Sequence, residues 1–202
     1  MSRRRLRAVI GVLLGGMLAA ASLAADAPPL RRDAEILRQK VASIAEFASE
    51  SAPKPHQTTI TENEVNAYLA YDAPAQLPVG VVEPAVSILG AGRVSARAVV
   101  DLDAVRKQKN PTSMLDPMSF LAGRLPLTAT GLLTTSNGTG RFDLESATLG
   151  GVPVPKMVLQ QIVSYYSRTP DNPSGISLDT PFALPARIRE IQVQPGQAII
   201  VQ

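Results

Sequence analysis

The sequence contains no cysteine, no tryptophan and a single histidine, His56. Without cysteine the chain can form no disulfide, no thiolate metal site and no thiol nucleophile, and it has no cysteine for a lipoprotein anchor. One histidine cannot make a zinc site without other ligands, and a serine–histidine pair would need an orienting acid that the sequence does not reveal. We therefore expect no metal and no cofactor, and a surface position for His56.

Positive charge is also scarce once the first residues are set aside. The full chain has 20 Lys and Arg against 17 Asp and Glu, a net charge of +3. Four of the basic residues lie at the very start: Arg3, Arg4, Arg5 and Arg7. Without them the chain is close to neutral. Nucleic-acid binding needs a basic patch that neutralises phosphates, so we exclude nucleic acid as a partner.

Those arginines open a segment typical of a cleavable signal peptide, residues 1–24. The uncharged apolar run Ala8–Leu23 follows them, and Ser22 and Ala24 form the small-residue pattern that precedes a cleavage site. Because the run is shorter than the ~20 residues that span a bilayer, we predict cleavage after Ala24 or Ala25 and no permanent membrane anchor. The arginine pair also resembles a twin-arginine signal, but we expect the general secretory route and a periplasmic protein.

Residues 25–202 are predicted to form a single domain of the α+β class. Helical spacing of apolar residues predicts a helix over Leu30–Glu50 and another over Lys156–Arg168. A Thr-Glu-Asn-Glu capping box that starts at Thr61 predicts a shorter helix over Glu62–Tyr71. In the first helix the expected buried stripe is Leu30, Ala34, Leu37, Val41, Ile44 and Ala48.

The remaining patterns predict β-hairpins. Strict alternation over Arg93–Leu102 follows a β-rich run, Val79–Leu89, in which Pro84 indicates an edge strand or a bulge. A second hairpin turns at Asn137-Gly138, which is a type I′ signal. A short strand over His56–Ile60 precedes both hairpins, and a pair of short strands ends the chain. Adjacent hairpins predict an antiparallel sheet with helices against one face.

Two segments interrupt this pattern. Asp103–Arg124 is polar at first and then contains Met and Pro, which predicts a connector with at most one short helix. Gly150–Pro155, which reads Gly-Gly-Val-Pro-Val-Pro, is expected to break the sheet before the last helix.

Two pairs of carboxylates lie two residues apart, Asp101/Asp103 and Asp143/Glu145. A glycosidase needs two carboxyls that face each other across a cleft, usually from separate elements. These carboxylates instead alternate with apolar residues, as solvent-facing strand residues do. Three arginines are placed to pair with them across strands: Arg93, Arg97 and Arg141. We therefore expect that the protein is not an enzyme.

Aliphatic side chains must fill the interior, because 45% of the residues are hydrophobic but only 4% are aromatic. Small residues, among them Ala96, Ala129 and Gly131, stand between larger aliphatic ones on the hairpins. Such strands could curve around a helix and leave an apolar pocket, or pack as an ordinary filled core. For a pocket we expect this lining: Val94, Ala98, Val100, Leu127, Leu133, Phe142, Leu144, Leu159 and Ile162.

At Ile60–Leu69, which reads Ile-Thr-Glu-Asn-Glu-Val-Asn-Ala-Tyr-Leu, the chain resembles bacterial envelope proteins of the YceB, YpmS and LmeA type. Gly150–Pro155 and Leu184–Ile191 also look similar to segments of these proteins. The resemblance implies a fold like that of tubular lipid-binding domains, in which a highly curved antiparallel sheet of long hairpins wraps around a long helix and holds an acyl chain. No ligand-contact residue carries over, because the matching motif caps a helix.

The expected function is therefore the binding of a lipid or another hydrophobic small molecule, in envelope lipid transport or maintenance. Two alternatives stay open. A filled core would favour a structural or adaptor protein that acts on an envelope protein partner, for example through the Leu30–Glu50 helix. An enzyme is the third possibility, and no residue stands out as a catalytic candidate.

Overall fold

The computed structural model describes residues 28–49, 51, 54–74, 77, 79–104, 123–166, 177 and 180–202. The expected signal peptide lies outside these ranges, as does the connector Asp103–Arg124 apart from its two ends.

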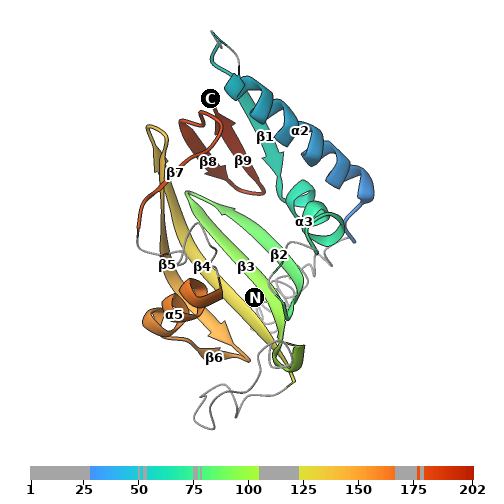
Figure 1. Cartoon of the computed structure of the whole chain (residues 1–202), viewed down its shortest axis with the longest axis vertical. Coiled ribbons are helices and arrows are strands. Elements are labelled where there is room, and N and C mark those ends of the chain that lie inside the picture. The colour runs from blue at the N-terminus through green and yellow to red at the C-terminus, as the bar shows by residue number, and fades with distance from the viewer. Residues whose placement is uncertain are drawn as a thin grey trace, which may run out of the picture.

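The described chain forms two antiparallel sheets with helices packed against them, which confirms the α+β class (Figure 1). The larger sheet has the order β2-β3-β4-β5-β6, and β7 also pairs with β5. Its strands are β2 (Val81–Gly90), β3 (Arg93–Asp101), β4 (Arg124–Ser136), β5 (Thr139–Leu149), β6 (Val152–Pro153) and β7 (Phe182–Ala183). The smaller sheet has the order β1-β9-β8, with β1 (Gln57–Thr61), β8 (Glu190–Gln194) and β9 (Gln197–Val201).

The small sheet lies at the end of the large sheet where the hairpin turns are (Figure 1). Strand β8 and the residue before it meet both turns through main-chain hydrogen bonds, since the Gly92 N–H donates to the Val193 carbonyl and the Gly138 N–H to the Arg189 carbonyl. At β4, the Thr135 hydroxyl donates to the Ile191 carbonyl and accepts from the Ile191 N–H. The two sheets are therefore joined through main-chain and side-chain hydrogen bonds.

The β2–β3 hairpin confirms both expectations for Pro84. The register shifts between Val82 and Ala85, which marks a bulge, and β2 is an edge strand of the large sheet. Helix α3 (Glu62–Tyr71) covers that edge with polar side chains. The Asn66 side-chain amide accepts from the Val86 N–H at 2.7 Å and donates to the Val86 carbonyl at 2.9 Å. The edge is thereby closed to further strands.

The β4–β5 hairpin turns as its sequence predicts, with positive φ at both Asn137 (49°) and Gly138 (77°). Its strands carry a bulge, because Thr130 pairs with Ser146 and Gly131 with Leu144. The expectation that Gly150–Pro155 breaks the sheet is wrong in part. The glycines turn the chain, but Val152–Pro153 then adds β6 to the edge of β5, since a proline is tolerated on an edge strand.

The first helix, α2 (Arg31–Ser49), buries Ala34, Leu37, Ile44 and Phe47. The expected stripe is wrong at Val41, which keeps 51% of its exposure. The first half of α2 packs on α3, while its second half packs on the small sheet, where Ile44 joins Ile188 and Ile200 in the core. His56 is exposed, as expected, and its ring stacks on Phe47 at 6.1 Å between ring centroids.

The described helices are packed on the sheets rather than enclosed by them. Helix α3 packs on β2, and the last helix, α5 (Lys156–Tyr166), packs on β5 at the opposite end from the small sheet (Figure 1). The predicted helices over Leu30–Glu50 and Glu62–Tyr71 are thus confirmed within one residue at each end.

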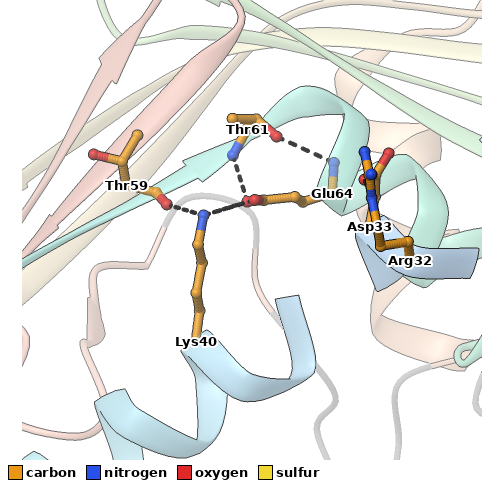
Figure 2. Close-up of polar contacts among 6 residues, drawn as sticks. All are labelled: Arg32, Asp33, Lys40, Thr59, Thr61 and Glu64. Carbon is orange, nitrogen blue, oxygen red and sulfur yellow. Dashed lines mark hydrogen bonds and ion pairs between the residues drawn. The ribbon is translucent and has the colours of Figure 1, made fainter. Parts of the chain in front are cut away.

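A polar cluster joins α2, β1 and α3 (Figure 2). The capping box is confirmed, since the Glu64 N–H donates to the Thr61 hydroxyl and the Thr61 N–H to the Glu64 carboxylate. From α2 the Lys40 ammonium donates to both carboxylate oxygens of Glu64, at 2.7 and 2.8 Å, and to the Thr59 carbonyl at 2.6 Å. Because the Glu64 side chain keeps only 10% of its exposure, this cluster locks the three elements together.

Candidate ligand-binding face

One face of the large sheet is aliphatic along all four long strands. Directly opposed residues of antiparallel strands point to the same side, so the register defines this face. In cross-strand rows, Val94 lies opposite Gly131, and Gly131 opposite Leu144. The members of this aliphatic face are Val81, Val86, Ile88, Val94, Ala96, Ala98, Val100, Leu125, Leu127, Ala129, Gly131, Leu133, Phe142, Leu144, Ala147 and Leu149.

The register brings seven of the nine predicted lining residues together on the aliphatic face: Val94, Ala98, Val100, Leu127, Leu133, Phe142 and Leu144. The eighth, Leu159, is buried on α5. The side chain of the ninth, Ile162, lies outside the described part of the structure.

Most members of the aliphatic face are only partly buried. Ile88, Gly131 and Ala147 are buried, while the other members keep part of their exposure. The largest member is Phe142 on β5. Its ring packs on Gly131 of the neighbouring strand β4, so closely that a Cβ added to Gly131 would collide with the ring. A partly exposed aliphatic surface of this extent has the composition of a hydrophobic binding site.

Alternation alone misses part of the aliphatic face. Glu145 stands unpaired in the β5 bulge, so the strand's inward positions change from Phe142 and Leu144 to Ala147 and Leu149. The sequence does carry a sign of this bulge. The apolar residues of the strand stand at even-numbered positions before Glu145 and at odd-numbered positions after it.

The opposite face of the large sheet is mainly polar, although Val99, Pro126 and Leu132 also lie on it. The Ser95 and Thr130 hydroxyls lie 3.0 Å apart in a hydrogen bond, and those of Thr128 and Thr148 lie 2.6 Å apart. Register places these residues on the side away from the aliphatic face. The large sheet therefore has one aliphatic and one mainly polar face.

The expected cross-strand pairing of carboxylates with arginines is confirmed for Arg93 and Glu145, whereas Arg141 pairs with Asp143 on its own strand. Arg93 donates to Glu145 with 2.8 and 2.9 Å between the nitrogens and oxygens, and Arg141 to Asp143 at 2.8 Å. Asp101 pairs with Arg124, a residue outside the predicted trio that stands directly opposite it on β4. These carboxylates are solvent-facing ion pairs and do not face each other across a cleft.

The pKa values of Glu145 and Asp101 should respond differently to the loss of Arg93. The Arg93 guanidinium lowers the pKa of Glu145 from 4.5, whereas the pKa of Asp101 is lowered first by the Ala104 N–H and then by Arg124. Arg93→Gln should therefore return the pKa of Glu145 towards 4.5 and leave that of Asp101 lowered. NMR titration of the side-chain carbons measures both.

The sign of the stability effect follows from the lowered pKa. Ionised Glu145 stabilises the fold above its unfolded pKa of 4.5, and this contribution is lost as the pH falls through the lower folded value. Arg93→Gln should reduce that acid-dependent part of the stability. An unchanged pKa of Glu145 in this variant would mean that the ion pair is not formed in solution.

A separate cleft of about 540 Å³, lined by both apolar and polar side chains, lies between the start of α2, helix α3 and the β2 bulge. Its lining includes Asn66 and Glu62, whose side chains already satisfy main-chain groups of β2. Over the described ranges, histidines and carboxylates form no group of three that could hold a metal ion. We assign no ligand to this cleft.

None of the helices in the described part of the chain is long and apolar enough to cross a membrane.

Comparison with known proteins adds little to this description. No family model matches the sequence, and no curated protein matches it. Among solved structures, a crystal structure of lipopolysaccharide binding protein is similar at 17% identity, with a TM-score of 0.23. The alignment covers 72% of this chain and 40% of that one, so the chain spans less than half of that protein's length. A likeness at this TM-score supports no inference about fold or function.

Proposed function

We propose that this protein is a non-catalytic binding module that holds a lipid or another hydrophobic small molecule on the aliphatic face. The observation that carries the proposal is that this face is aliphatic over four long strands yet stays partly exposed. A ligand that covers it would be stabilised by about 0.8 kcal/mol for each CH₂ group removed from water.

The sequence supports a location and a role for such a module. Residues 1–24 have the pattern of a cleavable signal peptide, which favours the periplasm. The resemblance of Ile60–Leu69 to YceB, YpmS and LmeA type proteins favours a role in envelope lipid transport or maintenance. The ion pairing of Asp101, Asp143 and Glu145 supports a function without acid–base catalysis.

Filling the aliphatic face from within should displace the ligand. Ala98 lies in the middle of this face, opposite Leu127, and is only partly buried, so a phenyl ring at this position has room to lie over its neighbours. We expect Ala98→Phe to lower the amount of co-purified lipid several-fold, roughly the effect of losing one or two buried CH₂ groups. Mass spectrometry of solvent extracts measures the lipid per protein.

The matched control is Thr134→Phe, which places the same ring at an exposed position on the polar side of β4. This variant should carry as much lipid as the unsubstituted protein. Thermal unfolding of both variants checks that the sheet still forms. Equal lipid content in a folded Ala98→Phe variant would show that the ligand, if any, binds elsewhere.

The alternative is a structural or adaptor protein that binds an envelope protein through α2. It is favoured by Leu30, directly before that helix, and by Val41 on it, which keep 53% and 51% of their exposure. A stoichiometric partner that co-purifies with the protein, and is lost on Leu30→Ser/Val41→Ser, would support this function. The binding module predicts instead that this double variant leaves the lipid content unchanged.

A further inference from the structure

We propose that the segment from β6 to the first turn of α5 docks the protein on the surface of an anionic phospholipid bilayer. The docking segment is defined by three side chains, Val152, Met157 and Val158. This inference rests on the proposed function, because it identifies where a lipid would pass between a bilayer and the aliphatic face.

The docking segment exposes large apolar side chains at high density. Val152, Met157 and Val158 keep 66%, 74% and 44% of their exposure, and they lie within seven residues of the chain. The next residue, Leu159, turns inward and is buried. Isolated exposed apolar residues are ordinary, but several in one short segment mark an interaction surface.

The charge of the docking segment favours an anionic surface as the occupant. From Gly150 to Tyr166 the chain contains one basic residue, Lys156, and no acidic residue. Lys156 opens α5 directly before Met157 and is exposed. Apolar side chains beside a lysine, in a segment whose own sequence carries no carboxylate, are the combination that binds the interface of an anionic membrane.

The docking segment is continuous with the aliphatic face. Ala98 stands opposite Leu127, Leu127 opposite Leu149, and Leu149 opposite Val152. This cross-strand row runs from β3 in the middle of the large sheet to β6 at its edge, beside α5 (Figure 1). An acyl chain that leaves a bilayer at Val152 would therefore meet aliphatic side chains along the whole row.

Co-sedimentation with vesicles of phosphatidylcholine, with and without phosphatidylglycerol, tests the docking segment. The unsubstituted protein should bind the vesicles that contain phosphatidylglycerol more strongly. Met157→Ser/Val158→Ser should lower that partition coefficient at least about tenfold, because two exposed side chains no longer enter the interface. The matched control, Leu30→Ser/Val41→Ser, removes two exposed apolar side chains at and directly before α2 and should bind as the unsubstituted protein does.

Two results would overturn the docking segment: equal loss of binding in both double variants, or no binding by the unsubstituted protein. Analytical ultracentrifugation adds a third, a dimer that Met157→Ser/Val158→Ser converts to monomer, which would make this surface a contact between two copies. The lipid content of the purified protein separates the two proposals. Lipid present without vesicle binding contradicts only the docking segment, whereas vesicle binding without any carried lipid contradicts the proposed function.

Discussion

Gly131→Ala is expected to destabilise the protein by about 3 kcal/mol, at the upper end of the usual cost of overpacking. A Cβ at this position would lie 2.7 Å from the Asp143 carbonyl oxygen and would also collide with the Phe142 ring. The carbonyl belongs to the β4–β5 ladder beside the bulge, so it cannot move without breaking strand pairing. Urea denaturation measures the loss in the free energy of unfolding.

Gly140→Ala is the matched control for this prediction. Gly140 lies on β5, and a Cβ there would come within 2.7 Å of Phe182, whose side chain is 44% exposed and can turn away. We expect a loss below about 1 kcal/mol. If Gly131→Ala were no more destabilising than Gly140→Ala, the close approach of Phe142 and the main chain around Gly131 would be wrong.

Glu64→Ala should cost about 2–3 kcal/mol, because it leaves Lys40 without its carboxylate and removes half of the capping box. The loss should be smaller than for a fully buried pair, since the Lys40 side chain keeps 28% of its exposure and its bond to the Thr59 carbonyl. Thermal or urea unfolding measures the effect.

Two variants test the cause of that loss. Glu64→Gln keeps an acceptor for the Thr61 N–H but loses the charge, so its stability should fall between those of Glu64→Ala and the unsubstituted protein. Glu35→Ala breaks an ion pair with Arg38 on the exposed side of α2 and should cost much less. A loss from Glu35→Ala as large as that from Glu64→Ala would contradict the structural role of the cluster.

The elements that sequence predicts well are those specified by neighbouring residues. The capping box at Thr61, the Asn137-Gly138 turn and the bulge at Pro84 each depend on main-chain geometry within four residues. Strand partners are different. That β1 pairs with β9 in a second sheet depends on tertiary packing, and nothing in the Gln57–Thr61 pattern specifies it.

The candidate site shows the same division. Alternation within β3 and the first part of β5 places Val94 and Phe142 correctly on one face. The same alternation cannot be continued past Glu145. This single unpaired residue shifts the strand by one position, so the side chains that follow point to the opposite face from the one that alternation predicts. The exposure of the aliphatic face could not be predicted either, since a filled core and an open face share one sequence pattern.

Native mass spectrometry of the protein purified gently from a bacterial periplasm is the most direct test of lipid binding. We expect a population whose mass exceeds that of the chain by the mass of a lipid, which solvent extraction then releases and identifies. A single mass equal to the chain alone, with no uptake when lipid is added, would contradict it and would favour the adaptor function instead.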